Sequence, residues 1–282
     1  MAKRWLIVNG DDFGRSSRIN EAIIRAHREG ILTSASLVVT GEAFAEAVVM
    51  AKETPSLAVG LHLVLAGGRA VLPPKAIPHL VDENGYFTAD PFRAGCRYFF
   101  SPACRRELSR EIEAQFARFA ATGLPLSHVD GHLHLHLHPV VFAHLLPLAV
   151  RYKAKGIRLP HDDFRTAIAY DHRFFLRKAA WNLALSFLSR TVRPRLRRCR
   201  LVTPDRVYGL LQTGEMREDY LLFVLSRLRG TIVECYFHPS SAFEEALGPN
   251  PVDLATLVSP AVRQALQEEG IRLTSYAALG EG

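Results

Sequence analysis

The chain is poor in cysteine, and its cysteines are widely spaced. The 282 residues include four of them, and no two form a C-x-x-C pair. Four scattered thiols are too few for a disulfide framework, and without paired spacing a cysteine zinc site is not expected. We therefore interpret them as reduced thiols, as in a cytosolic protein.

Long apolar runs are also missing. The longest apolar stretches, such as 140–150 and 179–188, are about half of the ~20 residues that a membrane-spanning helix needs. The amino-terminal segment has an apolar run of only four residues, whereas a signal peptide needs roughly 7–15. The sequence therefore predicts a cytoplasmic protein.

Acidic residues are absent from one long segment. The net charge of the chain is +7, and residues 172–204 hold nine Lys and Arg with no Asp or Glu. The rest of the chain therefore has a net charge of −2. Such a patch can contact nucleic acid, an anionic membrane surface or an acidic partner. No helix-turn-helix, zinc-finger or aromatic sheet motif accompanies it, so we do not expect a nucleic-acid partner.

The remaining composition is that of a folded protein, with 48% hydrophobic and 22% charged residues. Short apolar runs predict strands at 5–9, 34–40, 58–65, 126–136, 157–160, 231–237 and 271–275. Amphipathic patterns predict helices at 19–29, 42–53, 105–121, 140–155, 173–189, 217–229 and 260–269. This alternation predicts an α/β fold with parallel strands, either a closed barrel or an open sheet. In both, a site forms at the carboxyl ends of the strands.

The chain shows no internal repeat and no linker, so we expect one catalytic domain over residues 1–282. Residues 69–104 are rich in Pro and Gly and are predicted to be a loop insertion on the substrate side. No Gly-rich dinucleotide fingerprint follows any strand. The nearest pattern, at 9–14, has two acids where a phosphate would sit, which favours a cation.

Two adjacent carboxylates, Asp11 and Asp12, directly follow an apolar strand. Adjacent carboxylates repel one another, and a bound cation or a raised pKa is the usual resolution. The alternative is a helix N-cap with an acid in the first turn. His62 stands in a second apolar strand, where a lone histidine is more often part of the core.

The third cluster is rich in histidine, with five of the chain's twelve in the eleven positions 128–138. Alternate side chains of a strand share a face, so a strand here predicts one polar face. Its members would be His128, Asp130, His132, His134 and His136. Burying these groups without partners would cost several kcal/mol in total, which a metal and its hydrogen-bonded neighbours would remove.

Two histidines and one aspartate would leave coordination positions open for water and substrate. Such a site suits one divalent ion, Zn²⁺ or Mg²⁺, with Co²⁺, Mn²⁺ or Fe²⁺ as alternatives. Hydrolysis then needs a carboxylate base and an acid for the leaving group. His238, at a strand end beside a proline, suits the acid role, or is an ordinary surface histidine. Arg158, in a short apolar strand, would orient an acid or bind substrate, or is an exposed edge residue.

Together these motifs resemble the YdjC-like carbohydrate deacetylases, which share a barrel-type fold with polysaccharide deacetylases. The matching segments are 7–14, 60–63, 127–136 and 235–239, with Gly10 in place of the usual alanine. The resemblance implies a distorted (β/α) barrel of about seven parallel strands. It also implies that Asp12, His62 and His132 bind the metal, that Asp11 is the base, and that His238 is the acid. The other polar residues of the cluster and Arg158 would then bind substrate or support the ligands.

Within this family the chain is most similar to the hopanoid-biosynthesis-associated deacetylases. That similarity implies removal of acetyl from an N-acetylglucosaminyl hopanoid, with chito-oligosaccharides or another N-acetyl sugar as the alternative. For a lipid-linked substrate, the basic segment 173–200 is predicted to contact an anionic membrane, at the inner face of the membrane. Its alternative is a packed barrel helix followed by a solvated basic loop. A dimer is compatible with the sequence.

Other function classes stay open at this point. A metal-dependent phosphoesterase or amidohydrolase uses similar residues on similar barrels, generally with two or three metals. A histidine-rich metal-binding protein would bind the ion without turnover. The number of bound metal ions distinguishes the first alternative from a deacetylase, and a turnover assay distinguishes the second.

Overall fold

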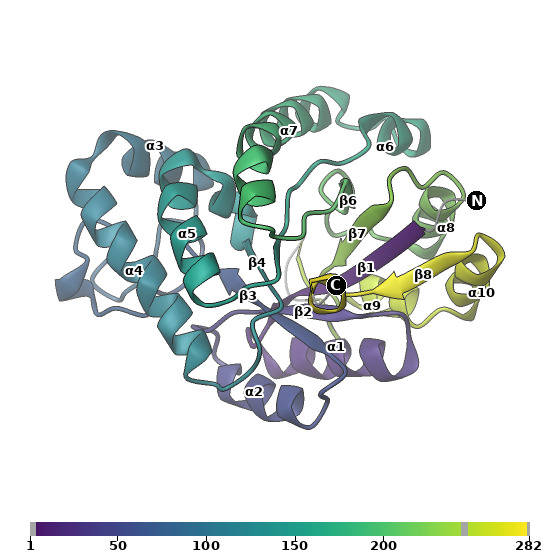
Figure 1. Ribbon diagram of the computed structural model, residues 1–282, viewed down its shortest axis with the longest axis horizontal. Helices are drawn as coiled ribbons and strands as arrows, with labels where there is room; N and C mark the ends of the chain where they lie inside the picture. The colour runs from purple at the N-terminus through teal and green to yellow at the C-terminus, as the bar shows by residue number, and fades with distance from the viewer. Residues whose placement is uncertain (1–3, 244–247, 281–282) are drawn as a thin grey trace.

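One sheet of parallel strands organises the computed structural model, which describes residues 4–243 and 248–280. The strands found there are β1 (Arg4–Phe13), β2 (Ser34–Leu37), β3 (Ala58–Leu63), β4 (His128–Gly131), β5 (Gly156–Ile157), β6 (Arg206–Tyr208), β7 (Ile232–Phe237) and β8 (Ile271–Thr274). Seven of them follow the order β5-β4-β3-β2-β1-β7-β6. The sheet is curled into a half-barrel with helices outside it, which confirms the predicted α/β distorted-barrel fold (Figure 1).

The central strand is β1. It pairs with β7 along one edge, while β8 and then β2 pair with successive parts of its other edge. Leu6 and Val8 of β1 are fully buried in the hydrophobic core together with Ile23 of the first helix. Because every strand pairing is parallel, the carboxyl ends of neighbouring strands meet at one edge of the half-barrel.

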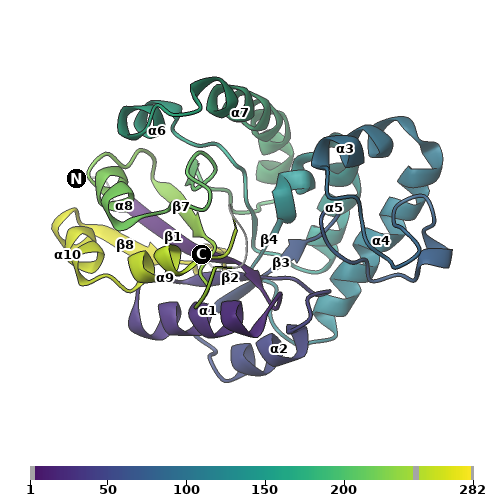
Figure 2. The ribbon, with the colours of Figure 1, turned by 180° about the vertical axis from the view of Figure 1, so that it is seen from behind.

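Helices surround the sheet (Figures 1 and 2). They are α1 (Ser17–Glu29), α2 (Phe44–Lys52), α3 (Pro91–Phe100), α4 (Pro102–Ala120), α5 (Pro139–Arg151), α6 (Phe164–Tyr170), α7 (Phe175–Arg198), α8 (Glu218–Leu225), α9 (Pro251–Leu257), α10 (Pro260–Glu268) and α11 (Tyr276–Leu279), with 3₁₀ turns η1 (Pro74–Ala76) and η2 (His132–Leu137). In α4 the buried residues Leu108, Ile112 and Phe116 recur at helical spacing, as predicted. Among the described residues, no helix is both long and apolar enough to cross a membrane.

Three predicted segments differ in the structure. The loop expected at 69–104 contains η1, α3 and the start of α4. The strand expected at 126–136 ends at Gly131, because Leu133 and His134 adopt left-handed conformations with φ of 53° and 57°. The helix expected at 173–189 continues to Arg198. The basic run is therefore helical, and the alternative of a solvated basic loop is wrong. The short elements β6, α6 and α9 escaped prediction because three to seven residues carry little periodicity.

Candidate active site

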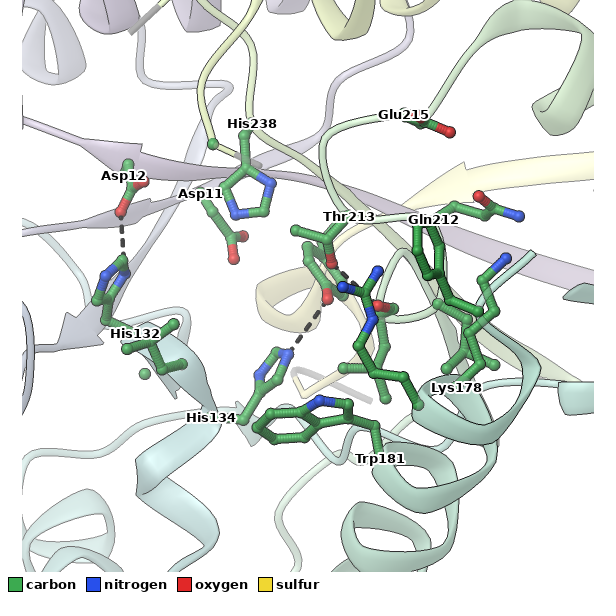
Figure 3. Close-up of a pocket in the computed structure, with 18 of the residues that line it drawn as sticks. Asp11, Asp12, His132, His134, Lys178, Trp181, Gln212, Thr213, Glu215 and His238 are labelled. Atoms are coloured by element: carbon green, nitrogen blue, oxygen red, sulfur yellow. Dashed lines mark hydrogen bonds and ion pairs between the residues drawn. The ribbon is translucent and has the colours of Figure 1, made fainter. Parts of the chain in front are cut away.

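A pocket of about 390 Å³ opens at the carboxyl ends of the strands. Side chains from β1, β3 and the segments after β4 and β7 meet there, as predicted for a parallel half-barrel. Figure 3 shows Asp12 and His132 on one side of it and Lys178 and Trp181 on the opposite side. The expected insertion at 69–104 contributes no residue to the lining of this pocket.

Both carboxylates at the end of β1 reach this pocket because the strand is irregular there. Alternation would direct Asp11 and Asp12 to opposite faces of the sheet. The pairing with β2 shifts register between Gly10 and Phe13, and Asp12 is left-handed, with φ of 66°. This bulge re-aims one side chain, so the two adjacent acids point into the same site.

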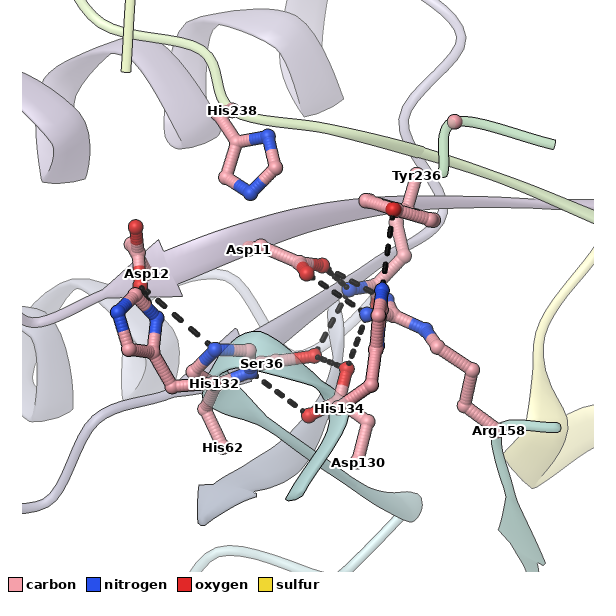
Figure 4. Close-up of polar contacts among 12 residues, drawn as sticks. Asp11, Asp12, Ser36, His62, Asp130, His132, His134, Arg158, Tyr236 and His238 are labelled. Carbon is pink, nitrogen blue, oxygen red and sulfur yellow. Dashed lines mark hydrogen bonds and ion pairs between the residues drawn. The ribbon is translucent and has the colours of Figure 1, made fainter. Parts of the chain in front are cut away.

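Asp12, His62 and His132 form a compact donor set (Figure 4). The Asp12 Oδ1 atom lies 3.7 Å from His62 Nε2 and 3.6 Å from His132 Nδ1. Asp12 and His62 are buried, whereas His132 is partly exposed to the pocket. Burial alone would raise the pKa of Asp12, but the two imidazoles hold it well below its usual range. One carboxylate oxygen and two imidazole nitrogens, all within 4.8 Å, could hold a divalent metal ion.

His62 is oriented by a second carboxylate, that of Asp130. The His62 Nδ1–H donates to Asp130 Oδ1 at 2.8 Å, so Nε2 faces Asp12. Burial opposes a charge on the ring, yet Asp130 raises the pKa of His62 to about 9. A carboxylate on the remote nitrogen is the usual partner of a metal-binding histidine.

Arg158 lies beneath these groups and is fully buried, so it is not an exposed edge residue. Its guanidinium donates to both oxygens of Asp11 at 2.7 Å, to Glu234 at 2.8 Å, and lies 2.9 Å from Asp130. Burial would lower the pKa of Arg158, but the carboxylates keep it well above the usual value. The two parallel bonds fix the orientation of the Asp11 carboxylate.

Arg158 also decides how many metal ions the pocket suits. Asp11, His62 and Asp130 form a second group with donor atoms close enough for a metal. The guanidinium already bridges both carboxylates of that group, so a second cation there would face a buried positive charge. The geometry therefore favours a single ion on Asp12, His62 and His132.

Comparisons with known proteins identify the family of the chain. The YdjC-like protein family matches residues 5–268. The chain belongs to this family. A carbohydrate deacetylase of Geobacillus stearothermophilus is 32% identical over 97% of both chains, and a chitooligosaccharide deacetylase of Serratia marcescens is 29% identical over 97% of this chain and 98% of that one. A crystal structure from Enterococcus faecalis V583, described as a cellobiose-phosphate cleavage protein, is 25% identical, with a TM-score of 0.75 and 99% of each chain covered.

The other histidines of this YdjC-like chain do not share one face, so that prediction is wrong. His128 is buried, 3.1 Å from Ser36 Oγ and stacked on Tyr276, and does not line the pocket. His136 is buried with Nε2 3.0 Å from the Arg158 carbonyl oxygen. Burial lowers the pKa of both rings to about 4, so both are neutral. The chain turns after Gly131, which ends the alternation on which the prediction depended.

Two of the predicted residues do reach the pocket beside the donor set. His134 lines it, with Nε2 3.2 Å from the Tyr236 hydroxyl, and burial lowers its pKa. His238 is partly buried and lines it too, and its backbone N–H donates to Asp253. Figure 4 shows the His238 ring above the gap between Asp11 and Asp12.

The sequence analysis missed several members of this site. Glu234 accepts from Arg158 and from the Tyr276 hydroxyl, and burial raises its pKa to about 7. Ser36 donates to Asp130 Oδ2 at 2.6 Å. A single acid inside the apolar strand 231–237 was the available signal for Glu234. Nothing in the sequence distinguishes Ser36 from other small strand residues.

The electrostatics of this YdjC-like site also fit a cation. The buried carboxylates of this site are Asp11, Asp12, Asp130 and Glu234, and the guanidinium of Arg158 is fully buried among them. Arg15, which is partly exposed, pairs with Asp12 at 3.2 Å. The His62 ring, whose pKa is raised to about 9, adds a positive charge next to Asp12, and a divalent ion on the donor set would replace that charge.

Proposed function

We propose that this protein is a metal-dependent hydrolase that removes the acetyl group from an N-acetylglucosamine unit, with residues 1–282 acting as one catalytic domain. The observation that carries the proposal is the position of Asp11. Arg158 orients it next to a buried donor set of one aspartate and two histidines, in one pocket. The names of the family and of its full-length relatives support the reaction.

Asp12, His62 and His132 would hold the metal. Their mixed oxygen and nitrogen donors suit Zn²⁺, and also Mg²⁺, Co²⁺, Mn²⁺ or Fe²⁺. When bound, such an ion supplies a Lewis acid that polarises the acetamide carbonyl and acidifies water. Asp130 directs the Nε2 atom of His62 toward the metal by accepting a hydrogen bond from the Nδ1–H group.

The chain's own acid and base would act on opposite steps of the hydrolysis. The Asp11 carboxylate accepts a proton from the attacking water, whose oxygen bonds to the acetyl carbon. His238, whose ring lies above the gap between Asp11 and Asp12, donates a proton to the nitrogen as the carbon–nitrogen bond breaks. The products are acetate and a free amine. His134 and Tyr236 line the same pocket and are placed to bind the sugar.

For the substrate we propose a hopanoid glycolipid. The pocket lining includes the apolar residues Leu133, Phe174, Trp181, Leu210 and Leu211 beside the charged Arg177 and Lys178, and Trp181 lies opposite the donor set (Figure 3). A free sugar presents hydroxyl groups to such a wall, whereas a triterpenoid aglycone presents hydrocarbon. Chito-oligosaccharides are the alternative, favoured by the Serratia marcescens relative.

The test is acetate release by the purified protein, loaded with Zn²⁺ or Mg²⁺, from an N-acetylglucosaminyl hopanoid and from chito-oligosaccharides in parallel. We expect release from the hopanoid that stops on chelation. Release from chito-oligosaccharides alone would keep the reaction and overturn the lipid substrate. Metal binding without release from either would instead support a metal-binding protein without turnover.

Two variants separate metal binding from chemistry in that assay. His132→Ala should lose both bound metal and activity, because it removes one of three donors. His144→Ala is the matched control, since this histidine of α5 lies outside the pocket and outside the donor groups. Full metal binding by His132→Ala would contradict the proposed ligand set.

A further inference from the structure

The outward side of α7 carries a continuous stripe of exposed residues. Its positions recur every three or four residues, the spacing of one helix face. We call it the α7 stripe, and its members are Leu176, Ala180, Leu183, Phe187, Arg190, Pro194 and Arg198, all exposed. The opposite face, with Leu185, Val192 and Leu196, is buried against the fold. Figures 1 and 2 both show α7 at the periphery of the molecule.

The first half of the α7 stripe is apolar, which is unusual for a solvent-facing surface. Leu176, Leu183 and Phe187 are 81%, 74% and 64% exposed. A helix on the surface of a globular protein normally places charged residues there. Grouped exposed apolar side chains mark a surface that binds another molecule.

The second half of the α7 stripe is basic. Arg190 and Arg198 belong to it, and Arg195 and Arg197 flank it. Within residues 4–243 and 248–280, none of these four arginines forms an ion pair with a carboxylate. The segment 172–204 contains no acid at all, so the whole surface attracts anions.

We propose that the α7 stripe docks this protein on the surface of an anionic lipid bilayer. Leu176, Leu183 and Phe187 would enter the boundary between headgroups and acyl chains, while the arginines contact lipid phosphates. A second copy of the chain is a poorer occupant. A two-fold interface brings the same patch to both sides, and this patch offers arginines no carboxylate to pair with.

The helix that carries the α7 stripe also borders the proposed active site. Arg177 and Trp181 of α7 line the pocket, and so does Phe174, the residue just before the helix. The pocket would therefore open beside the bilayer, and a lipid-linked sugar could enter it while its tail stays in the membrane. This benefit rests on the proposed glycolipid substrate, but docking itself is measured without any substrate.

The experiment is co-sedimentation of the full chain with vesicles of equal parts phosphatidylcholine and phosphatidylglycerol, and with pure phosphatidylcholine vesicles. The test variants are Leu183→Ser/Phe187→Ser and Arg190→Gln/Arg197→Gln/Arg198→Gln. The control is Val49→Ser/Val150→Ser, which removes two exposed apolar residues from α2 and α5. None of the residues substituted here lines the pocket. Acetate release from a water-soluble acetylated sugar is measured on every variant.

We expect the wild type and the control to bind the anionic vesicles, and salt to weaken that binding. Loss of three arginines should weaken it roughly 100-fold, at about fivefold per residue. Activity on the soluble sugar should not change. Equal binding by all variants, or wild-type protein left in the supernatant at low salt, would overturn the docking surface. A stripe variant that turns a dimer into a monomer without vesicle binding would assign the surface to a second copy. Vesicle binding without any deacetylation would leave docking intact and refute only the proposed reaction.

Discussion

The hydrogen bond from His62 to Asp130 makes the proposed metal centre testable by one isosteric substitution, Asp130→Asn. Asp130 uses both of its oxygens as acceptors. Oδ1 accepts from His62 Nδ1 at 2.8 Å, while Oδ2 accepts from Ser36 at 2.6 Å and lies 2.9 Å from Arg158. An asparagine has only one acceptor oxygen, so it cannot serve both sides.

Either orientation of the new amide disturbs the site. If the amide oxygen faces Arg158, the NH₂ group faces His62 Nδ1, which must then give up its proton. The proton moves to Nε2, the atom that faces Asp12, and the ring becomes the wrong tautomer for a ligand. If the oxygen faces His62 instead, the NH₂ group meets the guanidinium of Arg158, and two buried donors oppose each other.

The expected result is a 10–100-fold weaker affinity for Zn²⁺, the usual loss when the partner of a ligating histidine is removed. A competing chelator measures the dissociation constant. Glu234→Gln is the matched control, because it also removes a carboxylate from Arg158 but does not contact His62. Its amide oxygen can still accept from Arg158 Nε, and its NH₂ group can donate to the Tyr276 hydroxyl oxygen, which reverses the direction of that one bond. Equal affinities of the two variants for Zn²⁺ would refute the role of Asp130 in orienting His62.

Three further predictions concern the same region. Asp11→Asn should keep full metal binding and lose turnover by roughly 100-fold or more; near-normal acetate release would exclude it as the base. Arg158→Met should lower the free energy of unfolding by about 3–5 kcal/mol, because three buried carboxylates lose their cation; urea denaturation measures this, and an unchanged midpoint would contradict it. Gly60→Ala should cost about 1–3 kcal/mol, since its Cβ would lie 2.5 Å from the His128 ring, which Tyr276 backs; thermal unfolding against the wild type decides it.

The part of the site that the sequence predicted is the part at strand ends. Asp11 and Asp12 directly follow the apolar run of β1, and His62 lies near the carboxyl end of β3, and parallel pairing brings such strand ends together. The prediction of His132 depended on a strand over 126–136, but in the structure the strand ends at Gly131. Its proximity to Asp12 depends on the turn after Gly131, where Leu133 and His134 are left-handed. Non-glycine residues in that conformation are rare, and no residue type there signals it.

Arg158 shows why the rest of the site could not be predicted from the sequence. A charge directly after a short apolar strand is compatible with an exposed edge, and the burial of Arg158 depends on acids that lie far away in the sequence. Asp11 is 147 residues distant and Glu234 is 76. Only the curled sheet places β1, β4 and β7 around it. The role of Arg158 is thus a property of the topology, whereas a donor such as His62 is visible from its position in one strand.

The opposite problem arises at α7. Leu176, Leu183 and Phe187 recur at helical spacing, a pattern that normally identifies the buried face. In the structure that face points outward, and the helix contacts the fold through Lys178, Leu185 and Ser189 instead. Lys178 can be buried because it donates to Asp171 at 2.9 Å. The helix is therefore held by a polar anchor near the pocket, which leaves its apolar periodicity free to bind something outside the chain. An apolar face that the fold itself does not use is hard to explain in a helix with no partner, and the lipid surface proposed above would give it one.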